Sequence, residues 1–358
     1  MQEPLFIGAG TKGAKKVGNA FQPFMDFHGK ACLEYVVEAA MAAECVGDIY
    51  IWGDKKKLEK LLAEHKKNYR REIVIVEEHD NIVESFFFTF LNYLTSVSDV
   101  LDDIVVNWRS IRDIDWDRLQ KRFKKTDFWE KQIDVIASDT PLISAYEIDY
   151  LIRNKNHDAD IVLGRTVRKD YKAILEKLDA FPDKEKSVKN FYTYCVGDND
   201  VPMIVNSYMA GKPFKLNENM WNIINSFYEN RTIIAGRKKN LRKIATNLLF
   251  FKRLFFPKKD GTEGHTYAEK VKAGFYLVNA YKSIVKSKNA NIHYRDIKKI
   301  YRSVDTLVDL TIECNLSHCF GSAFDIDTTY EADFIRKNFF SLQDICTEYY
   351  KIHTGPRL

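Results

Sequence analysis

The apolar positions in the first half of the chain fall into short runs, separated by segments with helical spacing. Five runs have the length of buried strands: 4–7, 48–52, 72–76, 135–137 and 160–164. Three segments between them repeat their apolar residues with the period of a helix: 32–41, 55–65 and 82–94. A β-α-β-α-β-α-β order of this kind predicts an α/β fold, with a Rossmann-like, mostly parallel sheet covered by helices on both faces.

The second half of the chain is patterned less regularly. Residues 191–205 have strand character, and residues 216–302 have mostly helical spacing. Residues 310–324 are mixed, and residues 342–352 predict a last helix. No internal repeat and no low-complexity segment is present, so repeat architectures are excluded.

The distribution of charge separates three predicted parts of the chain. Residues 231–302 hold 19 Lys and Arg against 4 Asp and Glu, so their net charge is +15 and the rest of the chain carries −10 within a total of +5. We therefore predict a core at 1–230, a basic helical insertion at 231–305, and a return to the core with a C-terminal helix at 306–358.

Composition and cysteine usage limit the class of protein. The chain has 358 residues and 45% hydrophobic residues, enough for a sizeable core. Its six cysteines form no CxxC pair, so we expect reduced thiols in a cytoplasmic protein. Cys314, His318 and Cys319 lack a fourth nearby ligand and suggest zinc only weakly. Because no signal peptide and no apolar stretch of about 18 residues is present, we expect a soluble or at most peripheral protein.

The basic segment 248–259 combines phenylalanine and leucine with lysine and arginine. It fits either a peripheral membrane contact or a helix that packs on the core with its lysines in water, and we favour the helix. No recognition motif for nucleic acid accompanies the basic residues, so we expect no nucleic-acid partner.

The stretch 134–149 carries the most suggestive chemistry. An apolar run ends at Ala137, Asp139 follows, and Ser144 with Glu147 three residues on predicts a capped helix. Ligands of open α/β sheets lie outside the carboxyl ends of the strands, where a carboxylate can hold a divalent cation against a phosphate. The alternative is a turn in which Asp139 has only a conformational role.

A glycine-rich loop follows the first predicted strand. It consists of Gly8, Ala9, Gly10, Thr11, Lys12 and Gly13, with further lysines at Lys15 and Lys16. Glycines let backbone N–H groups surround an anion and lysines add positive charge, so the loop is a candidate phosphate site. Its spacing matches neither the Walker P-loop nor the dinucleotide fingerprint, and an ordinary strand-to-helix turn is the alternative.

Together these segments resemble the MobA-like and sugar-phosphate nucleotidyltransferases, which share a GT-A-type nucleotide-binding fold. The motifs that carry the likeness are the 8–13 loop, His28-Gly-Lys-Ala-Cys-Leu-Glu-Tyr-Val, Ile49-Tyr-Ile-Trp-Gly-Asp, Asp80-Asn, Ser138-Asp-Thr-Pro-Leu-Ile-Ser and Phe324-Asp-Ile-Asp-Thr-Thr-Tyr. The match covers residues 1–165 and 320–335 well. It implies transfer of NMP from an NTP to a small phosphorylated acceptor, such as a sugar-1-phosphate, with release of pyrophosphate.

The resemblance also implies roles for individual residues. The 8–13 loop and Asn81 would bind the NTP, and Lys12 and Lys30 would contact its phosphates. The family's metal-binding aspartate corresponds to Asp139, which would hold Mg²⁺.

One of two later carboxylates is expected to complete that metal site. The resemblance implies that Asp327 or Asp325 holds the Mg²⁺ with Asp139, and we favour Asp327. If the segment is a strand end, Asp325 and Asp327 share one face and both reach the site.

The chain departs from the family's pattern at two positions. Its first loop is one residue short, with Lys12 in place of an arginine, and Gln22 replaces a phosphate-contacting lysine seven residues before Gly29. The lost charge favours one alternative, a degenerate nucleotide-binding sensor or scaffold. Another alternative is a GT-A glycosyltransferase, with Asp325-Ile-Asp327 as its DxD motif.

Overall fold

The computed structural model describes twelve stretches of the chain: residues 2–12, 16–97, 114–167, 195–196, 202–215, 269, 271–276, 302–303, 306, 310–317, 321–326 and 328–354. The segment 248–259, most of the basic insertion, and the candidate residues Gly13, Lys15 and Asp327 lie outside them. None of the described helices is long and apolar enough to cross a membrane.

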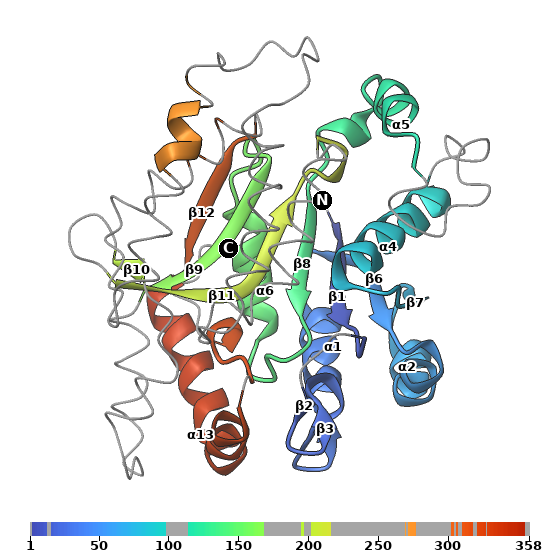
Figure 1. Cartoon of the computed structure of the whole chain (residues 1–358). Helices are drawn as coiled ribbons and strands as arrows, with labels where there is room; N and C mark the ends of the chain where they lie inside the picture. Colours follow the sequence, from blue (N-terminus) through green and yellow to red (C-terminus); the bar gives the residue numbers. More distant parts are fainter. Residues whose placement is uncertain are drawn as a thin grey trace, which may run out of the picture.

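A central sheet organises the described chain (Figure 1). Its strands are β1 (Glu3–Ala9), β6 (Val46–Gly53), β7 (Ile73–Glu77), β8 (Ile133–Ala137), β9 (Ile161–Val167), β10 (Cys195–Val196), β11 (Pro202–Gly211) and β12 (Ile312–Ser317). The order is β12-β9-β11-β8-β1-β6-β7, with β10 paired to β11. All neighbouring strands run parallel except in the pairs that β11 makes. The predicted α/β fold with a mostly parallel sheet is therefore confirmed.

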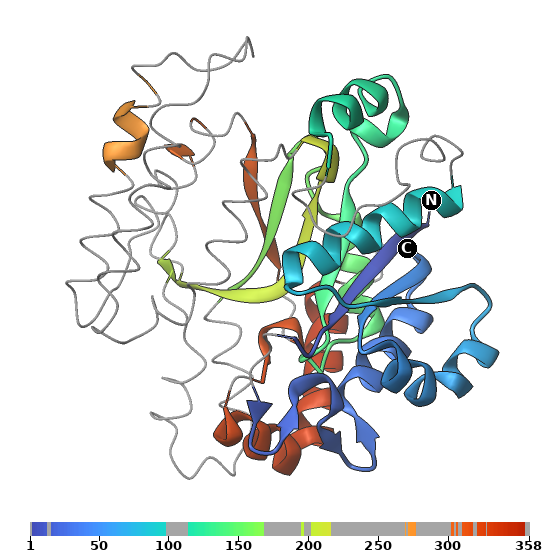
Figure 2. The same ribbon diagram turned by 45° about the vertical axis from the view of Figure 1, so that its right-hand side comes forward.

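Helices cover both faces of this sheet because side chains alternate along each strand. Leu5 and Ile7 of β1 pack in one core with α1 (Cys32–Ala42), α2 (Lys55–Leu61) and α6 (Ala145–Arg153). Phe6 points to the other face and packs with α4 (Ile82–Val97) and α5 (Trp116–Phe123). Figure 2 shows α4 lying across that second face.

A third apolar cluster joins the beginning and the end of the chain. It contains residues of α13 (Thr329–Thr354) together with Phe27 and Val17 from two small hairpins. The hairpins are β2 (Lys16–Val17) with β3 (Ala20–Phe21), and β4 (Asp26–Phe27) with β5 (Lys30–Ala31). His28 and Gly29 make the turn of the second hairpin with φ of 55° and 87°, as the tight turns of twisted hairpins require.

Polar residues at the helix starts fix where the helices begin. Asp54 caps α2, Asn81 caps α4 and Ser144 caps α6, each by accepting a backbone N–H from three residues on. The helix expected at 55–65 is two helices, because Leu62, with φ of −97° and ψ of 10°, interrupts the helical backbone between α2 and α3 (Ala63–Asn68).

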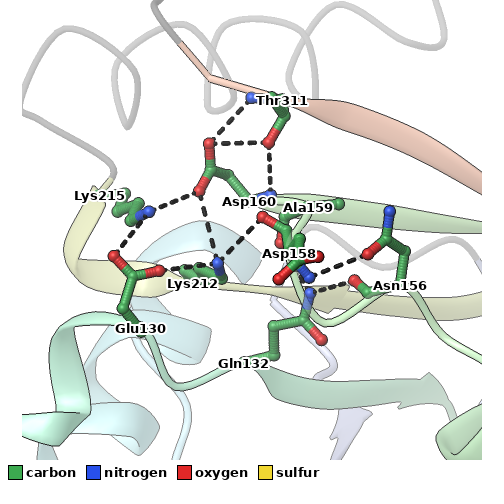
Figure 3. Close-up of polar contacts among 9 residues, drawn as sticks. All are labelled: Glu130, Gln132, Asn156, Asp158, Ala159, Asp160, Lys212, Lys215 and Thr311. Carbon is green, nitrogen blue, oxygen red and sulfur yellow. Dashed lines mark hydrogen bonds and ion pairs between the residues drawn. The ribbon is translucent and has the colours of Figure 1, made fainter.

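The chain returns to the sheet at β12, which pairs with β9. Just before this strand, the backbone N–H and the hydroxyl of Thr311 donate to Asp160 Oδ2 at 2.9 and 3.0 Å. Figure 3 shows that Asp160 also faces Lys215, at 3.0 Å, and that Glu130 bridges Lys215 and Lys212. Asp160 precedes the first residue of β9, so this charge network lies at the amino edge of the parallel strands and serves to anchor the returning segment.

Candidate active site

The order of the strands reverses between β1 and β8, the place where open α/β sheets have their ligand crevice. From β1 the chain goes to β6 and β7 on one side, and then returns to form β8 on the other side of β1. Such a reversal of strand order leaves an opening at the carboxyl ends of the two strands, where ligands of open α/β sheets bind. Gly8 is paired with Ala137 at this edge, so the loop after β1 and the turn after β8 start side by side.

Hydrogen bonds join that loop and that turn directly. The backbone N–H and the hydroxyl of Ser138 both donate to the carbonyl oxygen of Gly8, at 3.2 and 2.5 Å. Thr140 donates its hydroxyl to the carbonyl oxygen of Ala137 at 3.1 Å, which closes the turn around Asp139. Asp139 is half-buried at the predicted place, directly beyond the strand end.

The Asp139 carboxylate lies close to the first turn of α1. Burial, together with the nearby charge of Asp139, raises the pKa of the Cys32 thiol well above its usual value. Cys32 is fully buried and remains a neutral thiol, so it adds no charge to the site.

A third segment, far along the chain, packs against the same turn. The short helix η8 (Gly321–Ala323) lies so close to the β8–α6 connection that a Cβ added to Gly321 would be 2.2 Å from the carbonyl oxygen of Leu142. Ser322 donates its N–H and its hydroxyl to Glu147 Oε1 at 3.0 and 2.5 Å. Burial raises the pKa of Glu147 to about 7. These contacts hold the segment that carries Asp325 against the segment that carries Asp139.

The expectation of a strand end at Asp325 is wrong. Residues 324–326 follow η8 without regular secondary structure and have no strand partner, so strand alternation does not place Asp325 and Asp327 on one face. Asp325 is exposed at this edge, and Asp327 lies outside the described residues.

Gln22, although early in the chain, contacts the segment 324–326. Its side-chain amide donates to the carbonyl oxygen of Ile326, next to Asp325. Gln22 therefore lies beside the segment that carries Asp325.

The glycine-rich loop has a partner that the sequence analysis missed. The backbone N–H of Thr11 donates to Glu78 Oε2 at 2.5 Å, and the N–H of Lys12 donates to the same oxygen at 3.0 Å. The Thr11 hydroxyl donates to Glu78 Oε1 at 2.5 Å. A Cβ on Gly10 would meet Glu78 Oε2 at 3.0 Å, so the loop packs closely around this carboxylate. Only strand order could have revealed the contact, since β7 lies two positions from β1.

The candidate lysines are held by other carboxylates and carbonyls. Lys12 Nζ is 3.3 Å from the carbonyl oxygen of Glu78 and 3.8 Å from Asp80 Oδ1. Lys30 Nζ is 2.7 Å from one oxygen of Glu38 and 2.9 Å from the other, and this hydrogen-bonded contact raises the pKa of Lys30. Both ammonium groups therefore have oxygen partners within the protein, and a bound phosphate would compete with these partners.

The remaining candidate residues have structural contacts of their own. A Cβ on Gly8 would lie 2.6 Å from the Trp52 ring, so only glycine fits where β1 crosses that side chain. Ala9 is fully buried. Asn81 caps α4, and its role in binding a nucleotide stays a prediction.

The carboxylates suit a magnesium ion better than a metal with an all-protein ligand set. Among the residues that the structure describes, no group of three or more His, Cys, Asp and Glu could hold a metal. His318 and Cys319 of the weak zinc suggestion lie outside those residues. Mg²⁺ is commonly held by one or two carboxylates together with the phosphates of a substrate. Asp139 and Asp325, on two segments packed together, fit that pattern.

A cavity of about 270 Å³ opens beside the start of α13. It lies between the β2–β3 hairpin and the first turns of α13, and its lining includes Gly18, Met25, Asp26, Thr329, Asp333 and Arg336. It provides room for a small molecule.

Neither a protein-family model nor a curated protein matches the chain. Among solved structures, a hypothetical transferase from Thermus thermophilus has 9% identity and a TM-score of 0.46, over 92% of this chain and 99% of that chain. CMP:2-keto-3-deoxy-manno-octonic acid synthetase in complex with CTP has 9% identity and a TM-score of 0.40, over 95% and 99%. The 4-diphosphocytidyl-2C-methyl-D-erythritol synthase from Anaerococcus prevotii has 10% identity and a TM-score of 0.41, over 95% and 96%. Because identity and structural similarity are both low, we infer function from this chain's own residues.

Proposed function

We propose that the protein is a Mg²⁺-dependent nucleotidyltransferase of the MobA-like or sugar-phosphate type. It transfers NMP from an NTP to a small phosphorylated acceptor and releases pyrophosphate. One observation carries the proposal: the bonds from Ser138 to Gly8 join the glycine-rich loop and the turn of Asp139 at the crevice between β1 and β8. An anion-binding loop and a carboxylate at a strand end, at one such crevice, are the parts that a reaction between two phosphates needs.

Basic and acidic residues have different roles in this proposal. The N–H groups of the loop and Lys12 bind the triphosphate, and Lys30 adds a second positive charge after exchanging its contact with Glu38. Asp139 and Asp325, with Asp327, would hold Mg²⁺, which would neutralise charge on the reacting phosphates. The cavity between the β2–β3 hairpin and α13 receives the acceptor.

The reaction itself requires little proton transfer. An oxygen of the acceptor phosphate forms a bond to the α-phosphorus of the NTP, and the bond from that phosphorus to the pyrophosphate oxygen breaks. The attacking phosphate is already ionised near neutral pH, so no general base is needed. Positioning and charge neutralisation supply most of the rate enhancement.

Binding and turnover can be tested separately. We expect thermal stabilisation of the protein by one of ATP, GTP, CTP or UTP with Mg²⁺, and pyrophosphate release with that nucleotide and a panel of sugar-1-phosphates and alcohol phosphates. Stabilisation by none of the four, with no pyrophosphate from any pair, would contradict the proposal.

A nucleotide-binding protein without catalysis is the second candidate. The contact of Gln22 with Ile326, at the position of the family's lysine, favours it. It predicts stabilisation by a nucleotide but no pyrophosphate with any acceptor. A GT-A glycosyltransferase would instead bind a nucleotide-sugar and release a nucleoside diphosphate. A cytoplasmic location and a peripheral membrane contact through residues 248–259 stay predictions.

A further inference from the structure

The carboxylate of Glu78 takes up the hydrogen-bond donors of the glycine-rich loop. Glu78 is only 5% exposed, and its two oxygens accept the N–H groups of Thr11 and Lys12 and the hydroxyl of Thr11. Among the described residues, the polar contacts of Thr11 and Lys12 all go to Glu78 and Asp80. Successive N–H groups that converge on one carboxylate form the kind of cradle that binds a phosphate oxygen.

We propose that Glu78 is an internal competitor of the nucleotide's phosphates for this cradle, and that nucleotide binding exchanges one anion for the other. The inference rests on the proposed function and adds a means of regulation to it. A buried carboxylate needs hydrogen-bond partners, and a phosphate in the same cradle would both remove those partners and repel the charge. The two anions therefore exclude each other.

The part of the structure that moves in this exchange is the loop. Glu78 is held from behind, because its N–H donates to the carbonyl oxygen of Gly53 at 3.0 Å. The next residue, His79, donates its N–H to Ser85 Oγ at 2.9 Å and stacks on Phe88 with ring centroids 3.9 Å apart. The β7–α4 turn is thus tied to β6 and α4, whereas residues 10–12 are held to it chiefly through Glu78 itself.

The exchange also controls Lys12. While the loop lies on Glu78, Lys12 Nζ is held near the carbonyl oxygen of Glu78 and near Asp80, on the β7 side of β1. Asp139 lies on the β8 side of β1. When the loop leaves Glu78, both the N–H groups and the lysine become available to a triphosphate in the crevice. Ligand-free protein is therefore held in a low-affinity state.

Tripolyphosphate is the direct probe, because it has the charge of the NTP without a base or ribose. We expect Glu78→Ala and Glu78→Gln to bind tripolyphosphate and the preferred NTP with a Kd roughly tenfold lower than the unmodified protein, by isothermal titration calorimetry. Glu77→Gln is the matched control, since it removes the same charge from an exposed neighbour that does not contact the loop. It should change Kd by less than about twofold.

The outcomes separate this inference from the proposed function. If both Glu78 variants remain folded by circular dichroism and bind tripolyphosphate no more tightly than the unmodified protein, the competition is refuted. If the variants bind tripolyphosphate more tightly yet no nucleotide pair yields pyrophosphate, the competition stands and the proposed function fails. An equal decrease in Kd for Glu77→Gln would show that the effect comes from net charge alone, and would also overturn the inference.

Discussion

The Ser322 hydroxyl donates to the buried carboxylate of Glu147 across 175 residues of sequence, at 2.5 Å. This contact fastens η8, and with it the segment of Asp325, to the helix that follows Asp139. The carboxylate is fully buried and burial raises its pKa from 4.5 to about 7, so the join between the two segments is also a site where protons bind.

The protein's stability should fall as pH rises from about 4.5 to about 7, because of Glu147. The folded protein keeps the proton on Glu147 up to about pH 7, whereas the unfolded chain releases it near 4.5, so the folded state binds more protons between these values. The free energy of unfolding loses about 3 kcal/mol across that window and is level above it. Glu147→Gln should remove this loss. We expect urea unfolding at about pH 5 and about pH 8 to give a flatter pH dependence for the variant than for the unmodified protein. The same pH dependence in the variant and in the unmodified protein would contradict this prediction.

Gly321 should tolerate no side chain. An added Cβ would meet the carbonyl oxygen and carbon of Leu142 at 2.2 and 2.5 Å, and backbone atoms cannot rotate away. Gly321→Ala should lower the free energy of unfolding by about 2–4 kcal/mol and reduce pyrophosphate release, because the Asp325 segment must shift. Gly211→Ala is the control, with its nearest atom at 3.6 Å. Equal destabilisation of the two variants in urea titrations would show that the close approach is unimportant.

Asp139 should be required for turnover but not for folding. Asp139→Asn keeps the shape of the side chain and removes its charge, so we expect Mg²⁺-dependent pyrophosphate release to fall by roughly 10²–10³-fold with an unchanged circular dichroism spectrum. Asp344→Asn, at an exposed position on α13, should retain full activity. Full activity in Asp139→Asn would refute the metal assignment.

Gln22 should be convertible into a phosphate-binding residue. A lysine there can still donate to the carbonyl oxygen of Ile326 and adds the missing charge. We expect Gln22→Lys to lower the KM for the NTP by roughly 3- to 10-fold, with a gain that shrinks at high salt. Gln343→Lys, on α13, adds the same charge at a half-buried helix position and should leave KM unchanged. A similar gain in both variants would assign the effect to net charge.

The strands around the crevice follow directly from the sequence. The apolar runs became β1, β6, β7, β8 and β9, because strands covered by helices contain few polar residues. The position of Asp139 at a strand end followed from the same pattern. The antiparallel direction of β11 had no such signal, since apolar runs do not record direction.

Contacts between loops were the part that the sequence could not supply. Glu78 follows the apolar run of β7, but its contact with Thr11 depends on which strands are neighbours. The Asp325 segment looked like a strand end because apolar Phe324 and Ile326 alternate with carboxylates. Both apolar side chains are instead buried in the cluster that α13 forms with the hairpins, so tertiary packing and not a sheet produces the alternation.

The pairing of β12 with β9, which are far apart in sequence, has a consequence for folding during synthesis. Residues 312–317 complete the sheet edge only after more than 140 residues have followed β9, and the Glu147–Ser322 contact closes later still. Pairings so distant in sequence are slow to form. On the ribosome, the loop, Asp139 and α6 are all made long before Asp325, so the segments of Asp139 and Asp325 come together only after η8 has been made. A polypeptide stalled before η8 lacks the contact that fastens this segment to α6.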